Sequence, residues 1–207
     1  KLGTIISDAE AGGFTEAVGD AACTVRISPE KASGCDMVWI HSTDTSFSAE
    51  HAGAWENGLR EYVEDGGRLV LSMDAVRLLN VWGIEPSEIE SWEYECIDEG
   101  FGRKLGFHSR FSHPLFGGDL HGGAYTWHGT EDNICRLNGF DDKEFPSAEG
   151  AKVIACQWEY VFLRPDLKLI WETPVGKGSI LAIGGCLYFD RPNHDRAILD
   201  AFTRSCV

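Results

Sequence analysis

The 207-residue sequence predicts a layered α/β fold with a mostly parallel β-sheet, and three features of the chain support this prediction. The apolar run 179–185 follows the turn Gly176-Lys177-Gly178 and leads into a helical segment at 193–206, as in the last unit of such a domain. Upstream, an amphipathic segment ends in Asp65-Gly66-Gly67 and runs directly into the apolar residues 68–72. Strands and helices also alternate at intervals that predict parallel pairing through right-handed crossovers.

Alternating elements fill the first 82 residues. Short apolar or β-branched runs predict strands at residues 2–7, 24–28, 36–41 and 68–72. Residues 8–18 fit a helix or a loop, and a short helix is predicted at 74–82. Between them one helix is predicted from Ser48 onward, ended by a left-handed Gly66, because apolar residues recur at helical spacing at Ala52, Trp55, Leu59, Tyr62 and Val63.

The second half is less regular. Residues 83–150 have neither clean helical nor clean strand periodicity, so we expect an irregular insertion over one end of the sheet, with or without short strands. Strands return at 152–161, 167–173 and 179–189, and the turn residues 174–178 predict an antiparallel addition to the sheet. The terminal helix is expected to bury Ile198, Leu199, Phe202 and Cys206. No repeat or linker interrupts the chain, so one domain over 1–207 is predicted.

The charge of the chain argues against two classes of partner. Its 33 Asp+Glu against 18 Lys+Arg give a net charge of −15, which repels nucleic acid and anionic lipid. The longest apolar runs, such as 180–183, are far shorter than the ~20 residues that cross a bilayer. We therefore expect no nucleic-acid and no membrane partner. The chain begins at Lys1 without a signal sequence, which fits a processed segment and leaves a cytoplasmic or a secreted or periplasmic location open.

The seven cysteines show no C-x-x-C pair, so a zinc ribbon or a thioredoxin-type site is not expected. Cys156 and Cys186 lie in apolar runs and are interpreted as small buried residues. Cys23 and Cys35 flank a short predicted strand, and in an oxidising compartment they are candidates for a disulfide. No cofactor is predicted.

Three segments, 62–72, 112–118 and 176–185, carry a family resemblance. Together they resemble the class I glutamine amidotransferase-like superfamily, in particular ThuA-like proteins and the amidotransferase-like domains of bacterial β-galactosidases. The resemblance implies a flavodoxin-like three-layer sandwich and an association with sugar metabolism.

The resemblance does not extend to catalysis. Working members place a nucleophilic cysteine on a tight elbow after the strand that corresponds to 68–72, activated by a His-Glu pair. This chain has Ser72-Met73-Asp74-Ala75 there, with no cysteine and no glycine to permit a strained turn. The late His-x-Glu is also missing, because the last strand continues into 188–190. Glutamine hydrolysis is therefore not expected.

Other residues remain candidates for catalysis: Ser72, Asp74, His113 and Glu159. Ser72 needs a histidine base within hydrogen-bond reach, and otherwise it is an ordinary serine at a strand end. Asp74 follows a strand at the edge where open α/β sheets bind ligands, although charge at a helix N-terminus also explains it.

The insertion supplies candidates for binding. His113, His121 and His128 are candidate metal ligands, but their spacing matches no closed zinc motif, and structural or solvated histidines are the alternative. Trp92 and Trp127 are candidates to stack on a sugar ring, with His128 and Asp44 as polar partners. Four other tryptophans lie on predicted core elements and are assigned to packing: Trp39, Trp55, Trp158 and Trp171.

Two functions follow from these features. The first is a non-catalytic amidotransferase-like domain in carbohydrate metabolism, which acts as an accessory, ligand-binding or oligomerisation module. Its partners would be a carbohydrate or small polar ligand, a second copy of the chain, or neighbouring domains of a larger protein. The second is a hydrolase that acts on a glycan or small polar substrate through Asp, Glu and His residues near the carboxyl ends of the strands.

Overall fold

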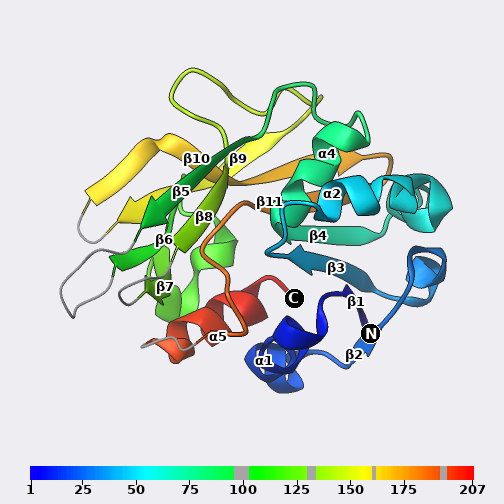
Figure 1. The fold of residues 1–207 in the computed structure, drawn as a ribbon, viewed down its shortest axis with the longest axis horizontal. Coiled ribbons are helices and arrows are strands. Elements are labelled where there is room, and N and C mark those ends of the chain that lie inside the picture. Colours follow the sequence, from blue (N-terminus) through cyan, green and yellow to red (C-terminus); the bar gives the residue numbers. More distant parts are fainter. Residues whose placement is uncertain (96–102, 130–133, 160–161, 192–194) are drawn as a thin grey trace.

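One mixed sheet runs through the computed structural model, which describes residues 1–95, 103–129, 134–159, 162–191 and 195–207 (Figure 1). Its strands follow the order β2-β1-β3-β4-β11-β10-β9-β6-β7. They are β1 (Leu2–Ile5), β2 (Thr24–Arg26), β3 (Met37–Ser42), β4 (Arg68–Met73), β6 (Arg103–Ser109), β7 (Gly123–Gly129), β9 (Lys152–Glu159), β10 (Phe162–Val175) and β11 (Gly178–Ile183).

The parallel half of the sheet comprises β2, β1, β3, β4 and β11. Its central strands are apolar on both faces, and all six residues of β3 are buried, because helices cover both sides. Helices α1 (Asp8–Val18) and α5 (Arg196–Ser205) pack on one face, and the other face carries α2 (Phe47–Glu50), α3 (Arg60–Glu64) and α4 (Leu78–Val81) (Figure 1). The predicted α/β sandwich is confirmed.

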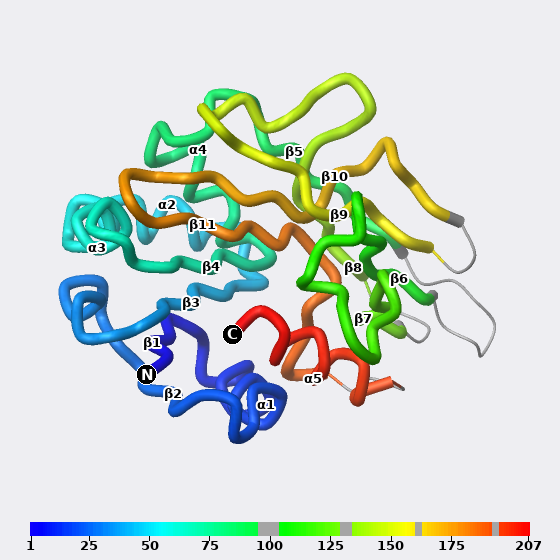
Figure 2. The backbone as a smooth tube through the Cα atoms, turned by 180° about the vertical axis from the view of Figure 1, so that it is seen from behind, coloured from blue at the N-terminus to red at the C-terminus, as the bar shows by residue number. Residues whose placement is uncertain are grey.

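From β11 onward the sheet is antiparallel. Strand β10 pairs antiparallel with β11, as the turn residues predicted, and β9, β6 and β7 continue in the same way. Figure 2 shows β6 and β7 on the opposite side of the molecule from β1 and β2. The antiparallel addition is therefore larger than the sequence indicated.

Residues 83–150 are more regular than expected. They contain β5 (Glu90–Glu95) and β8 (Ile134–Gly139), which form a separate two-stranded sheet, together with β6 and β7 of the main sheet. Strand alternation is hidden because the β6–β7 register shifts between Leu105 and Gly106. A Cβ at Gly106 would lie 1.8 Å from the carbonyl oxygen of Ala124, so this close approach requires glycine.

The single helix predicted from Ser48 onward is wrong. The segment is broken into α2, two irregular turns and α3, and the break lies at Gly58, whose φ is +118°. A Cβ on Gly58 would lie 3.1 Å from Cα of Glu30, so the chain bends where another backbone segment passes. The helical spacing therefore predicted the buried side chains of this segment correctly, but it did not predict that the helix is broken.

The proposed Cys23–Cys35 disulfide is not formed, and both thiols are free. The strands that follow the two cysteines, β2 and β3, lie on opposite sides of β1. Two strand spacings amount to about 10 Å, beyond the Cα separation that a disulfide tolerates.

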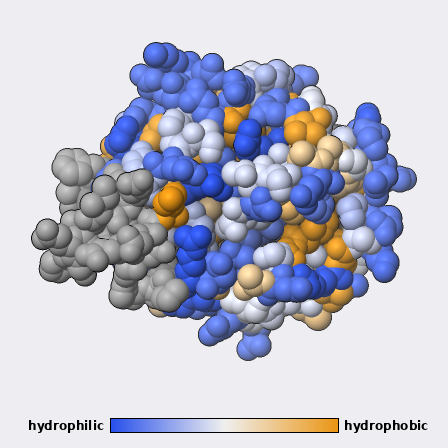
Figure 3. Space-filling view, in the orientation of Figure 1, coloured by the Kyte–Doolittle hydropathy of each residue, from blue (hydrophilic) through white to orange (hydrophobic). Residues whose placement is uncertain are grey.

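The surface is mainly polar. Hydrophilic residues cover most of the face in Figure 3, with small apolar patches between them. Among the described helices, none has both the length and the apolar character needed to cross a membrane.

Candidate functional site at the end of strand β4

A sharp elbow joins β4 to the following 3₁₀ turn, Asp74–Arg77. Met73 forms it with φ 58° and ψ −128°, a conformation that costs a non-glycine residue about 1–3 kcal/mol. The strained turn therefore forms here although the segment has no glycine to permit it. Surrounding packing holds the strained residue, because Met73 is fully buried.

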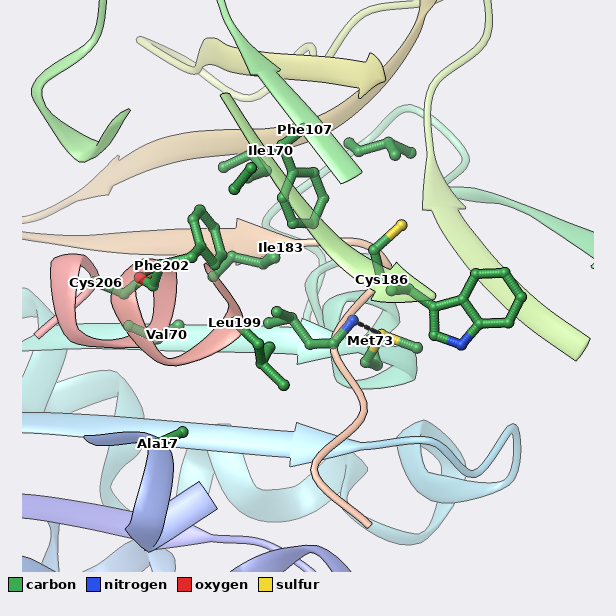
Figure 4. Close-up of a cluster of buried hydrophobic side chains, with 14 of the residues drawn as sticks. Ala17, Val70, Met73, Phe107, Ile170, Ile183, Cys186, Leu199, Phe202 and Cys206 are labelled. Carbon is green, nitrogen blue, oxygen red and sulfur yellow. Dashed lines mark hydrogen bonds between the residues drawn. The ribbon is translucent and has the colours of Figure 1, made fainter. Parts of the chain in front are cut away.

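The side chain at the elbow is part of the hydrophobic core. Met73 lies beside Cys186 in a cluster that also contains Ile183, Leu199 and Phe202 (Figure 4). Its Sδ accepts a hydrogen bond from the Leu187 N–H at 3.3 Å, drawn as a dashed line in Figure 4. A thioether cannot form the thiolate that makes cysteine a nucleophile. The elbow thus presents a packing residue in place of a reactive one.

Ser72, the residue before the elbow, lies within hydrogen-bond distance of a histidine, as a catalytic serine requires. Ser72 Oγ lies 2.7 Å from His41 Nδ1. It also accepts a hydrogen bond from the Trp39 Nε1–H at 2.7 Å. His41 and Ser72 face each other in the register of the adjacent parallel strands β3 and β4. The sequence did hold this signal, since both polar residues end apolar strands that were predicted as parallel.

A carboxylate completes the arrangement. Glu10, in the first turn of α1, places Oε2 3.6 Å from His41 Nε2 and accepts the Phe189 N–H at 2.7 Å. Burial by itself would raise the pKa of Glu10, but His41 and the Phe189 N–H lower it to a value below its usual range. The carboxylate is therefore ionised near neutral pH. Sequence reasoning missed Glu10, because no motif links α1 to the end of β3.

The order Ser72, His41, Glu10 is that of a serine-hydrolase triad, but its setting differs from that of an open active site. The three residues are 0%, 1% and 2% exposed, respectively. A substrate needs access to the serine oxygen, which here is enclosed by Trp39 and His41. In this state the chain of contacts connects α1, β3, β4 and the segment after β11.

Asp74 is also buried, at 1% exposure, and forms an ion pair. Its Oδ2 accepts from Arg136 Nη1 at 3.0 Å, and Arg136 also binds Glu93 at 2.8 Å. Burial raises the pKa of Asp74, and Arg136 only partly offsets this effect. Asp74 thus ties the elbow to β8. Arg136 was not singled out in the sequence, because nothing there indicates that β8 lies beside the elbow.

The remaining catalytic candidates do not converge on Asp74. Glu159 ends β9, which is separated from β4 by β11 and β10, so three strand spacings of about 14 Å in total lie between them. Paired glycosidase carboxylates are about 5–10 Å apart. His113 lines a cavity with Arg68, at the opposite end of β4, and its Nδ1 accepts the Leu115 N–H.

The predicted binding residues are also dispersed. Trp127 is only 4% exposed, and Trp92 is half-buried against the same core. Both rings therefore contact core residues. His128 is buried on β7, whereas Asp44 is exposed and accepts the Ser46 N–H at 2.8 Å. Exposed His121 follows a 3₁₀ turn in the left-handed conformation. Within the described ranges, no three His, Cys, Asp or Glu side chains are grouped closely enough to hold a metal ion.

Comparison with known proteins gives matches by structure alone. No family model and no curated protein matches the sequence. A β-galactosidase from Rahnella sp. R3 matches with a TM-score of 0.59 at 14% identity, over 100% of this chain and 30% of that chain. A β-galactosidase from Bacillus circulans sp. alkalophilus matches with a TM-score of 0.56 at 13% identity, over the same shares. PurLQS from Thermotoga maritima matches with a TM-score of 0.55 at 9% identity, over 98% of this chain and 93% of that chain.

These likenesses concern the fold. The chain spans 30% of the length of the two β-galactosidase chains, whereas it spans nearly the whole matched PurLQS chain. At the level of the fold, these matches agree with the flavodoxin-like sandwich that the sequence resemblance implies.

Proposed function

We propose that this chain is a non-catalytic amidotransferase-like domain that serves as an accessory, ligand-binding or oligomerisation module in carbohydrate metabolism. The observation that carries the proposal is the elbow itself. Its backbone keeps the strained conformation, yet the side chain on it is a fully buried methionine whose sulfur accepts a hydrogen bond from Leu187. Such a site has no nucleophile to offer at the position where the superfamily's chemistry takes place.

The link with carbohydrates rests on the matched structures. Two β-galactosidases match this chain over its entire length but over only 30% of their own. The matched part is thus one portion of a larger glycosidase, and we infer a similar auxiliary relation here. The likeness in fold supports this role without identifying a ligand.

Glutamine hydrolysis is the first test. We expect the purified chain to release no glutamate from glutamine above the rate of a protein-free blank. Met73→Cys should remain inactive as well, because a thiol at this position stays enclosed by the core. Release of glutamate by the wild type, with loss in Ser72→Ala, would overturn the proposal.

The accessory role is tested separately, by sedimentation velocity and by titration with galactose and lactose. Self-association, or saturable binding of one of these sugars, is the expected result. A chain that stays monomeric at high concentration and binds neither sugar would contradict a module of this kind.

One observation favours a second candidate, a serine-dependent hydrolase. Ser72 contacts His41 Nδ1 at 2.7 Å, and the Glu10 carboxylate lies 3.6 Å from His41 Nε2, which is the order of a nucleophile, a base and an orienting acid. Hydrolysis would require a conformational change that exposes Ser72 and brings Glu10 within hydrogen-bond distance of His41. Labelling with a fluorophosphonate probe distinguishes the two functions. Labelling of the wild type that disappears in Ser72→Ala supports the hydrolase, and absence of labelling supports the non-catalytic module.

A further inference from the structure

Two adjoining cavities lie at the end of the parallel strands opposite the elbow. One, of about 450 Å³, lies between residues 110–114 and the segment 145–153. The other, of about 250 Å³, reaches Arg68 and Ser179 at the starts of β4 and β11. Both are lined by His113, Pro114, Ile154 and Glu172, so they form one continuous hollow.

The larger cavity is mainly apolar and has a few charged groups. Its apolar lining is provided by Phe111, Pro114, Phe145, Pro146, Val153 and Ile154. Phe111 and Phe145 are 91% and 51% exposed, respectively, and phenylalanine side chains are usually more deeply buried. The volume lies within the range of about 300–1,000 Å³ that small-molecule sites occupy.

Packing holds one wall of the cavity in place. Lys168 is only 2% exposed, and its ammonium group lies 4.0 Å from the ring centroid of Phe145. The same ammonium group donates to the carbonyl of Glu144 at 2.9 Å and to that of Asp141. A buried cation with these contacts fixes both the Phe145 ring and the loop that carries it.

Backbone contacts fix the facing wall. The Arg110 N–H donates to the Ile154 carbonyl at 2.7 Å, and the His113 N–H donates to Ser109 Oγ at 2.7 Å. Between these anchors Phe111 and Ser112 both have left-handed backbones, with φ 56° and 52°. Two consecutive non-glycine residues in this conformation are strained, and here they hold the Phe111 ring in solvent.

The charged groups of the lining suggest what the cavity binds. Arg110 and Lys152 form no ion pair with any carboxylate in the described part of the chain, although the whole chain carries a net charge of −15. The half-buried Arg110 guanidinium lies 5.4 Å from the Phe111 ring centroid, and this contact with the ring face leaves its N–H groups able to bind an anion. Glu172 also lines the cavity and lies opposite Lys152 in the register of β9 and β10, where its carboxylate offers an acceptor for a hydroxyl or N–H group of the ligand.

We propose that this cavity binds a small carboxylate attached to a ring with an apolar face. The carboxylate would contact Arg110 and Lys152, and the ring would lie against Phe145, Pro114 and Ile154. Aromatic acids and sugar acids share this chemistry. The site is separate from the elbow, and the inference does not depend on the function proposed above.

The test is isothermal titration of the purified chain with benzoate and with glucuronate, and with their neutral counterparts benzyl alcohol and glucose. At least one acid should bind saturably, and its neutral counterpart should bind about tenfold more weakly or not at all. Which acid binds decides between an aromatic acid and a sugar acid.

Variants assign the binding to the cavity. Arg110→Gln and Lys152→Gln should each weaken binding of the acid about tenfold. Lys31→Gln, a matched change of an exposed lysine outside the cavity, should leave it unaltered. Melting temperatures near that of the wild type establish that the variants are folded, and Lys152, being exposed, is the safer of the two substitutions. Absence of binding by both acids, equal binding of a neutral counterpart, or wild-type affinity in both cavity variants would overturn the inference.

Discussion

At the scale of single residues, the elbow separates two properties that a reactive site normally combines, strained backbone geometry and a reactive side chain. Met73 keeps the first, with φ 58°, and replaces the second with a buried thioether. The strain of about 1–3 kcal/mol is offset by the core contacts of the methionine side chain. The geometry therefore persists here without the chemistry.

The enclosure of this position predicts how a thiol would behave there. In a Cys23→Ser background, which removes an exposed thiol, Met73→Cys should react with iodoacetamide only after unfolding. The measurement is mass spectrometry of the alkylated peptide in native buffer and in urea. Wild-type Cys23 serves as the reactive control. Rapid alkylation of the introduced thiol in native buffer would show that the elbow is open to solvent.

Glu10 predicts a pH dependence. Its folded-state pKa is lowered, so its contribution to stability is present above about pH 4.5 and is lost as pH falls through the folded value. Glu10→Gln should lower the free energy of unfolding by about 1–3 kcal/mol at pH 7. The difference from wild type should shrink below pH 4.5. Urea unfolding monitored between about pH 3 and pH 7 measures both effects.

Asp190 provides a matched control of opposite sign. Burial raises its pKa, and the charge of Glu10 raises it further. A raised carboxyl pKa means that ionisation in the folded state costs stability as pH rises. Asp190→Asn should therefore stabilise the protein at pH 7, where Glu10→Gln destabilises it. If both substitutions shift stability in the same direction, the proposed electrostatics are incorrect.

At the scale of elements, the two neighbouring glycines of α1 have different roles. A Cβ at Gly12 meets nothing within 4 Å, whereas one at Gly13 would lie 2.0 Å from the carbonyl oxygen of Phe189. Helix α1 thus approaches the backbone after β11 closely at Gly13. That approach brings Glu10 to the Phe189 N–H.

This contrast gives a prediction with an internal control. Gly12→Ala should raise the free energy of unfolding by about 0.5–1 kcal/mol, because alanine favours the helix. Gly13→Ala should lower it by about 1–3 kcal/mol, because the added methyl group forces the helix away from Phe189. Urea unfolding of the two variants decides the point, and equal effects would contradict the docking of α1 described here.

At the scale of the whole molecule, α5 connects the two halves of the sheet. Its Phe202 is fully buried and stacks on Phe107 of β6, with 5.1 Å between the ring centroids. The Phe202 ring centroid also lies 5.5 Å from that of Phe116. On its other side α5 packs against α1, which covers the parallel strands (Figure 1). The last helix is therefore shared by the parallel and the antiparallel parts.

Because the core under α5 is shared, we expect the two halves to unfold together. Phe202→Ala should cost about 3–5 kcal/mol and still give one transition. Circular dichroism and tryptophan fluorescence, followed through urea unfolding, should report coincident midpoints. Two separate midpoints, in the wild type or in the variant, would mean that the halves are independent folding units.

Local patterns in the sequence determined the parallel core of this fold. Apolar runs bounded by turn residues, such as 68–72 and 179–185, gave the strands β4 and β11 and their order, because burial on both faces requires nearly continuous apolar residues. The turn residues before β11 gave its antiparallel partner β10 for the same local reason. The sequence also showed directly that the elbow has no cysteine, because this depends on residue identity alone.

Tertiary structure alone decided which residues join His41 and Ser72 at the site. Glu10 and Arg136 come from two further elements, and their contacts depend on helix docking and strand packing that no local pattern encodes. The same holds for the strands within 83–150, whose alternation is obscured by a bulge and close glycine contacts. It holds equally for the cavity between Arg110 and Phe145. Sequence periodicity reports which face of an element is buried, whereas only the packed chain determines which distant residue covers it.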